Sequence, residues 1–358
     1  MDPLGEWAIV FGAESYLELV STSDPEDRVE LVWNGEEDLA YGDFHPGGQT
    51  ALIVGSEGQV LRYARSDHSV TDAGGDLEFG QISLTSVAWN SGGSWAYVGG
   101  TDGWLWRMRA AADGGAEVHP IQGRGSSDVT GMDCHPSVMA CVVTSLVDGI
   151  GVIDRDHNLH WLGGVGHPWS DVVCPTTESA ICVAVSHDRT IATVTLDAEL
   201  AATSEVSLVQ VTGTEGYFTG ISRQSGDRSL IMVAPFSLIE HDLSLNSSYP
   251  WLENSDVVEY DAGVSNSRIV ATWGTDRDSG WILTDRGEMV RYHPPLSNSL
   301  GGVLEVWVLI AIPAVIILVI LSFALGLSPG LQQRFTLRFG TAEEKRAARR
   351  EARRRKGR

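Results

Sequence analysis

The stretch that decides the fold runs from Asp43 to Tyr63 and reads DFHPGGQTALIVGSEGQVLRY. It recurs from Val87 to Arg107 as VAWNSGGSWAYVGGTDGWLWR. In both copies a glycine turn precedes a short apolar run, and an acidic residue followed by glycine precedes the next run. Short apolar runs separated by such turns are typical of adjacent antiparallel strands.

Weaker copies extend this pattern along the chain. They begin near Asp133, Val173, Gly220 and Arg268, and a partial copy covers residues 7–20. The second strand of each copy starts near Ala8, Ala51, Ala96, Ala140, Ile181, Leu230 and Trp281. One such sheet cannot bury its faces alone, so copies of about 40–50 residues are expected to stack in a ring. The sequence therefore predicts an all-β propeller over residues 1–295, of seven blades, with six or eight blades and a two-sheet sandwich as alternatives.

The repeated phrase resembles that of WD-repeat propellers over residues 7–292. The phrase is Phe or Trp, His or Asn, a glycine turn, then Ala-Leu-Ile-Val-Gly and Asp-Gly-x-Leu. The terminal Trp-Asp pair of that family is absent, and Arg62-Tyr63, Arg107-Met108, Ile153-Asp154 and Arg291-Tyr292 stand there instead. The resemblance implies a propeller used for binding, and the missing pair leaves the subfamily open.

The beginning of the chain is unusual for such a ring. The first copy starts at what corresponds to a second strand, so the first blade is expected to be incomplete. Residues 1–6 also lack the basic and apolar regions of a secretory signal. We expect both features to have one cause, a sequence that lacks its natural N-terminus.

Residues 306–327 form an uncharged apolar segment bounded by Val306 and Leu327, after a short linker at 296–305. As a helix it would span roughly 33 Å at ~1.5 Å per residue, about the thickness of a bilayer core. A buried helix of a soluble core is the alternative. The flank before it is acidic and the flank after it is basic, which predicts a single-pass cell-membrane protein with the large domain outside and residues 328–358 in the cytoplasm.

The tail after this segment is basic. Its cations are Lys345, Arg346, Arg349, Arg350, Arg353, Arg354, Arg355 and Lys356. Thr341 and Glu344 have the spacing of a capping box, which predicts a helix. We expect the tail to lie on anionic lipid headgroups. RNA, a ribosome or an acidic partner is the alternative.

The sequence contains four cysteines, Cys134, Cys141, Cys174 and Cys182. Each pair flanks one expected hairpin. Pairing within each hairpin is favoured, and an exterior location permits it. Four buried thiols are the alternative. Zinc is disfavoured because Cys-x₂-Cys spacing is absent.

The histidines and acidic turns are candidate catalytic or metal residues. His45 and His135 both precede proline at the same repeat position, which indicates a structural role. His157 lies in DRDHN at residues 154–158, and Asp276 and Asp278 form a similar pair. Both segments are interpreted as turns because the spacing of an EF-hand is missing. Calcium binding is the alternative. No other cofactor is predicted.

Aromatic and glycosylation motifs are the remaining candidates. Asp102-Gly103-Trp104 resembles a part of the Asp-box of sialidase-like propellers, and the full pattern of that motif is absent. Trp104 and Trp106 should lie on one strand face, packing between blades rather than binding sugar. The sequence has one glycosylation sequon, at Asn246, in an expected loop.

The acidic excess of the large domain restricts the kinds of ligand that it can bind. Residues 1–330 hold 14 Arg and Lys against 44 Asp and Glu, whereas residues 331–358 hold 11 against 3. Such an acidic domain repels nucleic acid. The first hypothesis is a non-enzymatic scaffold that binds a protein or a glycan outside the cell. A quinoprotein-like or glycosidase-like enzyme with its site at the central channel, and an assembly factor for membrane proteins, are the alternatives.

Overall fold

The computed structural model describes residues 1–74, 79–111, 115–175, 178–224, 226–253, 267–274, 279–292, 313 and 329–356. The chain divides into two compact units, residues 1–294 and residues 295–358. The linker and the apolar segment between Val306 and Leu327 lie outside the described residues, apart from Pro313, which is helical.

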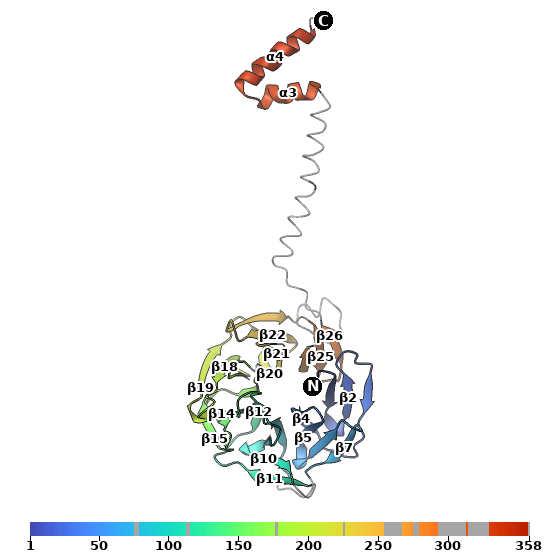
Figure 1. Ribbon diagram of the computed structural model, residues 1–358, viewed down its shortest axis with the longest axis vertical. Coiled ribbons are helices and arrows are strands. Elements are labelled where there is room, and N and C mark those ends of the chain that lie inside the picture. The colour runs from blue at the N-terminus through green and yellow to red at the C-terminus, as the bar shows by residue number, and fades with distance from the viewer. Residues whose placement is uncertain are drawn as a thin grey trace. The chain divides into compact units, whose positions relative to one another are not determined.

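The first unit consists of seven antiparallel sheets arranged as a ring (Figure 1). Blade 1 contains β1 (Trp7–Phe11), β2 (Leu17–Ser21) and β3 (Arg28–Glu30). Blade 2 contains β4 (Leu39–Phe44), β5 (Thr50–Gly55), β6 (Val60–Ala64) and β7 (Ser69–Asp72). Blade 3 contains β8 (Leu84–Trp89), β9 (Ala96–Gly100), β10 (Leu105–Ala110) and β11 (Ala116–Pro120). Blade 4 contains β12 (Val129–Cys134), β13 (Cys141–Ser145), β14 (Gly149–Ile153) and β15 (Leu159–Gly163).

The remaining three blades complete the ring. Blade 5 contains β16 (Trp169–Val173), β17 (Ile181–Ser186), β18 (Thr190–Thr195) and β19 (Glu205–Gln210). Blade 6 contains β20 (Tyr217–Arg223), β21 (Arg228–Ala234), β22 (Ser237–Asp242) and β23 (Ser247–Leu252). Blade 7 contains β24 (Ile269–Gly274), β25 (Gly280–Thr284) and β26 (Met289–Tyr292). The predicted seven-bladed propeller is confirmed, and the six-bladed, eight-bladed and sandwich alternatives are wrong.

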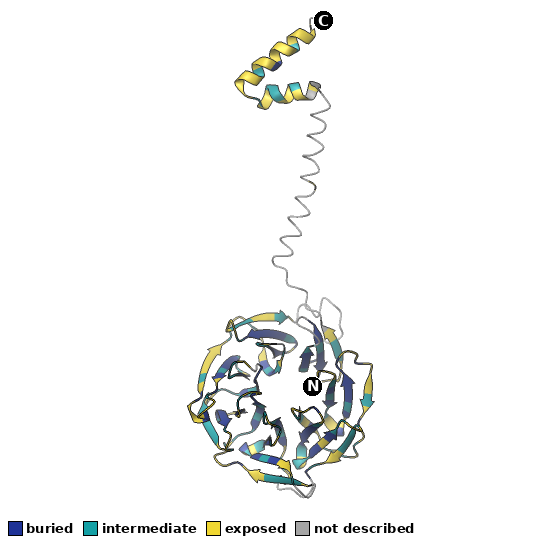
Figure 2. Ribbon diagram, viewed as in Figure 1, coloured by how far each residue is buried: buried dark blue, intermediate teal, exposed yellow. Residues whose placement is uncertain are grey.

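Burial changes from the axis outward. The inner strands mix buried positions with half-buried or exposed ones. The outer strands β11, β15, β19 and β23 are half-buried or exposed along their length (Figure 2). The middle strands β9, β13 and β14 are buried at every position. Strands buried on both faces appear in the sequence as continuous apolar runs, which is why the second strand of each copy was the clearest feature.

The core is divided among the contacts between blades. Each of the seven contacts has its own cluster of buried apolar side chains, for example Trp169 with Val142 between blades 4 and 5. The ring closes where Val10 and Val20 of blade 1 pack against Trp273 and Leu283 of blade 7. Closure among the described residues therefore rests on side-chain packing rather than on a shared sheet.

Blade 1 has three described strands, and its innermost strand is β1. A tight turn at Ala13–Ser15 follows β1, just as Ser56–Gly58 follows β5 and Thr101–Gly103 follows β9. The central residue of each turn has a positive φ, 54° at Glu14, 55° at Glu57 and 56° at Asp102. By this match β1 corresponds to a second strand, as the sequence predicts.

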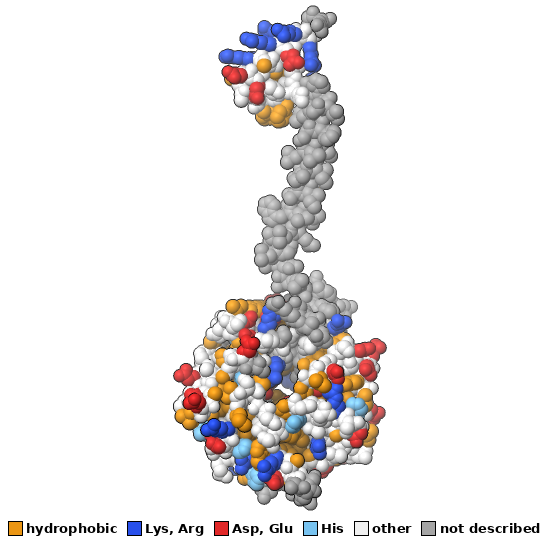
Figure 3. All heavy atoms as spheres, in the orientation of Figure 1, with side chains coloured by type: hydrophobic (Ala, Val, Ile, Leu, Met, Phe, Trp, Pro, Cys, Tyr) orange, Lys and Arg blue, Asp and Glu red, His pale blue; other side chains and the backbone are white. Residues whose placement is uncertain are grey.

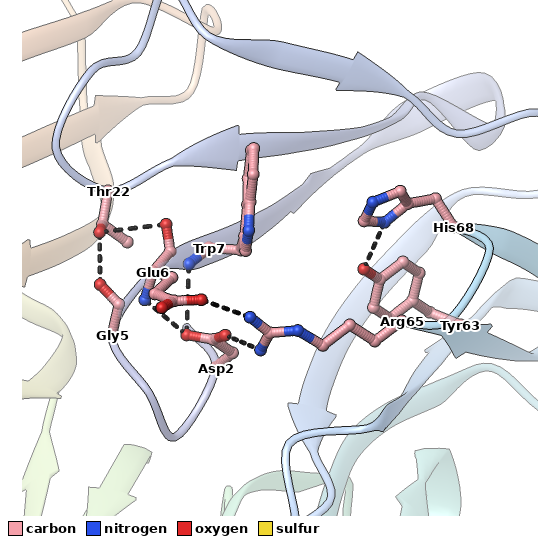
Figure 4. A network of polar contacts seen from close by, with 8 residues as sticks. All are labelled: Asp2, Gly5, Glu6, Trp7, Thr22, Tyr63, Arg65 and His68. Carbon is pink, nitrogen blue, oxygen red and sulfur yellow. Dashed lines mark hydrogen bonds and ion pairs between the residues drawn. The ribbon is translucent and has the colours of Figure 1, made fainter.

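The turn before β1 is linked to two blades (Figure 4). The Asp2 carboxylate accepts hydrogen bonds from the amides of Glu6 and Trp7 and pairs with Arg65 of blade 2 at 2.6 Å. Arg65 also contacts Glu6, and Thr22 donates to the Gly5 carbonyl. The Asp2 side chain is fully buried in this pairing, so the turn is held by a desolvated ion pair.

The cysteines form two disulfides, Cys134–Cys141 and Cys174–Cys182. This is the pairing that the sequence favours. Cys134 and Cys141 are direct cross-strand partners in the hairpin of β12 and β13. All four sulfurs are buried between blades, and the alternative of four free thiols does not apply to the structure.

The second unit contains two described helices, α3 (Pro329–Phe339) and α4 (Ala342–Lys356). The predicted capping box is confirmed, because the Thr341 amide donates to Glu344 Oε2 at 2.8 Å and the Glu344 amide donates to Thr341 Oγ1 at 3.4 Å. The eight predicted cations from Lys345 to Lys356 all lie on α4. Among the residues described, no helix is long and apolar enough to cross a membrane.

Candidate functional site

Polar side chains gather where inner strands line the central channel. Asp43 is the penultimate residue of β4 and Asp133 is the penultimate residue of β12, at equivalent repeat positions. Asp43 Oδ2 accepts a hydrogen bond from the Trp89 amide of blade 3 at 2.9 Å, and Asp133 Oδ2 accepts one from the Cys174 amide of blade 5 at 2.7 Å. Each carboxylate thus links its own inner strand to the next.

Asp171 and Arg223 extend these links around the ring. Asp171 Oδ2 accepts a hydrogen bond from the Ile221 amide of blade 6 at 3.1 Å, and its Oδ1 accepts one from Val172 at 2.8 Å. Arg223 of blade 6 donates to Asp133 of blade 4 at 2.8 Å, so the contact passes over blade 5. With Tyr41 of β4, these four residues form what we call the channel group.

Burial and mutual repulsion perturb the channel group. Burial raises the pKa of Asp43 to about 6 and that of Asp171 to about 7, although the amides that bond to them act in the opposite direction. The negative charge of Asp171, followed by burial, raises the pKa of Tyr41 well above its ordinary value. The pKa of Arg223 is raised by Asp133, so this guanidinium stays charged. Two carboxyls therefore change charge near neutral pH.

The chemistry open to the channel group is limited by its hydrogen bonds. Carboxyls that titrate near neutrality are typical of general acids and bases. Here, however, Asp43, Asp133 and Asp171 each hold the backbone amide of the following blade. The group is best explained as a set of polar links that fixes neighbouring blades at the channel.

The two histidines before proline have the structural role that the sequence indicates. His45 Nε2 lies 3.0 Å from the Gly93 carbonyl of blade 3, and His135 Nε2 lies 2.8 Å from the Ser179 carbonyl of blade 5. The Nδ1 atom of His45 accepts a hydrogen bond from the Gly47 amide, and that of His135 accepts one from the Ser137 amide. Both donors belong to the same turn as the ring. Both rings join one hairpin turn to the turn of the next blade.

His157 lies in a turn, as predicted. The Asp154 carboxylate accepts from the amides of Asp156 and Asn158 and contacts His160 at 2.9 Å. Among the described residues no group of acidic, histidine or cysteine side chains has the arrangement of a metal site. Asp276 and Asp278 lie outside the described residues.

A second polar group surrounds Trp95, at the end of blade 3 that faces blade 4. We call it the Trp95 cluster, and its members are Trp95, Tyr97, Arg107, Arg109, His119 and His157. The register of β9, β10 and β11 places Tyr97, Arg107 and His119 in one cross-strand row. Arg109 and Trp95 lie at the next position on the same face, since side chains alternate along each strand.

Cations lie against the ring of Trp95 on this face. The guanidinium carbons of Arg107 and Arg109 lie 4.8 Å and 4.5 Å from its centroid, which is the range of cation–π attraction. The His157 ring lies 5.1 Å away and the His119 ring 6.1 Å away. Figure 3 shows arginine and histidine side chains gathered over this lower-left part of the ring. Such a concentration is unusual in a domain with three times more acidic than basic residues.

The electrostatics of the Trp95 cluster leave one arginine without a carboxylate. Arg109 pairs with Glu117 at 2.7 Å, whereas Arg107 forms no ion pair with a carboxylate among the described residues. Burial, followed by Arg107, lowers the pKa of His157, which is therefore neutral at pH 7, and its Nδ1 shares a hydrogen bond of 2.8 Å with the Tyr97 hydroxyl. Burial raises the pKa of Tyr97 to about 12, so its hydroxyl stays protonated at pH 7.

The other aromatic candidates pack as predicted. Trp104 and Trp106 stack with centroids 5.3 Å apart, and Trp106 is buried beside Phe79 between blades 2 and 3. The Arg124 guanidinium covers the Trp104 ring at 3.4 Å. Asn246 of the sequon is exposed in the turn between β22 and β23.

Sequence reasoning missed both polar groups. Asp43 and Asp133 carried a visible signal, because each stands two residues before the histidine of the repeated phrase. The sequence signal for the Trp95 cluster was weaker, because the alignment of Trp95, Arg107 and Arg109 depends on the register of the strands. Arg223 carried none, because its partner is 90 residues away.

Comparisons with known proteins do not identify a family. No family profile matches the chain, and no curated protein sequence matches it. The resemblance to WD repeats therefore stays a prediction from the repeated phrase, while the propeller itself is seen in the structure.

Proposed function

We propose that this chain is a membrane-anchored propeller that binds another protein outside the cell through the Trp95 cluster, without catalysis. The observation that carries the proposal is the partly exposed Trp95 between Arg107 and Arg109. Tryptophan, tyrosine and arginine dominate the energetic centres of protein interfaces. The cluster is held by strand register and by the Tyr97–His157 hydrogen bond, so little ordering is required on binding.

Membrane anchorage is supported by the sequence and by the second unit. The uncharged segment from Val306 to Leu327 has the length of a membrane helix. The eight cations of α4 suit the anionic cytoplasmic surface, and this asymmetry supports a cytoplasmic tail. Two disulfides in the propeller are consistent with an oxidising exterior.

A catalytic channel is the second candidate function. It is favoured by Asp43 and Asp171, whose pKa values of about 6 and about 7 place them near neutrality. A panel of chromogenic glycosides tests it on the full chain. Turnover that disappears in Asp171→Asn would support a glycosidase-like site, whereas no turnover above the variant's level would argue against it.

Retention of a partner tests the binding proposal. The tagged full chain in detergent is immobilised and exposed to a membrane and envelope extract of the source cells. Two variants alter the cluster in different ways: Trp95→Ala removes the ring, and Arg109→Glu reverses an exposed charge. Tyr249→Ala, an exposed aromatic on the outer strand of blade 6, is the matched control.

The proposal expects a protein that the wild type and Tyr249→Ala retain and that both cluster variants lose by tenfold or more. Equal retention by all four forms would contradict a role for the cluster. A retained glycan in place of a protein would correct the class of partner. Unchanged melting temperatures would show that the variants remain folded.

A further inference from the structure

A cleft of about 250 Å³ lies where blades 5, 6 and 7 meet. His187 comes from the turn between β17 and β18, Tyr217 and Thr219 from the start of β20, and Arg268 from the residue before β24. These parts of the propeller lie at the opposite ends of the strands from the Trp95 cluster. The cleft is therefore separate from the surface proposed for the protein partner.

The walls of the cleft combine a flat aromatic surface with an apolar base. The His187 and Tyr217 rings are stacked, with centroids 5.8 Å apart and planes inclined by 14°. Met232 and Ile269 line the cleft and are almost completely buried, at 5% and 1% exposed, whereas Val270, which also lines it, is exposed. Apolar walls with a few polar groups are the usual composition of a small-ligand site, and this volume lies just below the usual range of about 300–1,000 Å³.

One cation stands at this cleft without a compensating acid. Arg268 forms no ion pair with a carboxylate among the described residues. The nearby Asp285 accepts from the Arg268 backbone amide. Burial, followed by Arg268, lowers the pKa of His187 although the neighbouring Asp188 acts in the opposite direction, so this ring is neutral at pH 7. Asp188 is paired with His167 at 2.7 Å, so Arg268 is the cation that lines the cleft. A planar guanidinium binds a carboxylate through two parallel hydrogen bonds.

We propose that this cleft binds a carboxylate attached to a small apolar body, with Arg268 holding the carboxylate and the His187–Tyr217 stack contacting the body. Such a group can come from a free organic acid or from an acidic side chain of a polypeptide. The volume admits either one, and it excludes a folded segment. The shared chemistry is one negative charge beside a flat or branched apolar surface.

Titration calorimetry on the full chain in detergent tests the proposal. The probes are benzoate, its neutral analogue benzamide, and a blocked pentapeptide with one central glutamate. Benzoate is expected to bind with a Kd in the low millimolar range, and benzamide at least tenfold more weakly. Arg268→Gln and Tyr217→Ala should each weaken the binding of benzoate by fivefold or more. Arg286→Gln, which changes an exposed arginine in the β25–β26 turn, should leave it unchanged.

Each outcome has a definite meaning. Peptide binding as tight as benzoate binding would assign the cleft to a polypeptide carboxylate, and benzoate binding alone would assign it to a small acid. Equal binding of benzoate and benzamide, or full benzoate affinity in Arg268→Gln, would overturn the proposal. Binding of neither probe by the folded wild type would overturn it as well. Loss of the Trp95 partner has no bearing on these measurements, so the two proposals fail independently.

Discussion

Asp133 joins three blades at the channel. Its carboxylate belongs to blade 4, accepts from the Cys174 amide of blade 5 and pairs with Arg223 of blade 6. Asp43 repeats the first of these contacts between blades 2 and 3. Single carboxylates thus fix the spacing of inner strands that have no sheet hydrogen bonds with one another.

Removing this carboxylate should weaken the ring. Asp133→Ala leaves the Cys174 amide without its acceptor and Arg223 without its partner, so we expect a loss of about 1–3 kcal/mol in the free energy of unfolding. Urea unfolding of the full chain, followed by tryptophan fluorescence, measures it. Asp156→Ala, an exposed aspartate on the same blade, should cost less than about 0.5 kcal/mol. Equal costs for the two variants would refute the linking role.

Asp171 should make stability depend on pH. Its pKa is about 7 in the folded protein and 3.8 ordinarily, so the folded state holds the proton more tightly. The resulting stabilisation is full below about pH 4 and is lost as the pH rises to about 7. Relative to Asp171→Asn, which does not titrate, the wild type should lose on the order of 2 kcal/mol across this window.

Melting temperatures of the two proteins at pH 4, 5, 6, 7 and 8 give this difference. Asp43→Asn provides a check on the pH range of this effect. The pKa of Asp43 is about 6, so the stability that its proton contributes should be lost about one pH unit lower than that of Asp171. A constant difference between wild type and Asp171→Asn from pH 4 to 8 would show that the folded protein does not raise the Asp171 pKa.

At the scale of the element, the hairpin turns explain why the repeat is visible in the sequence. The turn between the second and third strands of blades 2 and 3 ends in Gly58 and Gly103, both with positive φ. At Gly103 a Cβ atom would meet the Gly125 carbonyl oxygen at 2.3 Å. Backbone geometry and close approach both favour glycine there, so the acidic-Gly phrase recurs in blades 2 and 3, whereas blade 1 has Glu14-Ser15 in the same turn.

This requirement gives a matched pair of substitutions in blade 3. Gly103→Ala should destabilise the protein by about 2–4 kcal/mol, because the left-handed backbone and the Gly125 carbonyl both oppose a side chain. Gly92→Ala should change stability by less than about 1 kcal/mol, because its Cβ would meet no atom within 4 Å. Thermal unfolding of both variants measures the two stability losses. Similar losses would contradict the requirement for glycine at position 103.

At the scale of the whole molecule, the sequence predicted what depends on local pattern. Buried middle strands, glycine turns and a period of 40–50 residues were sufficient for a seven-bladed ring, and hairpin geometry was sufficient for the cysteine pairing. The closing contact of Val10 and Val20 with Trp273 was not predictable, because it joins opposite ends of the domain. The Trp95 cluster and the Arg268 cleft were missed for the same reason, since each takes residues from more than one blade.

The central claim is that the ring presents the Trp95 cluster to a protein partner outside the cell. Photo-crosslinking on intact source cells tests it most directly, with a photoreactive residue placed at position 109 of the full chain and, as the control, at position 249. We predict a covalent protein adduct from position 109 that protease added outside the cells removes, and no such adduct from position 249. Equal adducts from both positions, or an adduct from position 109 that external protease cannot reach, would contradict it.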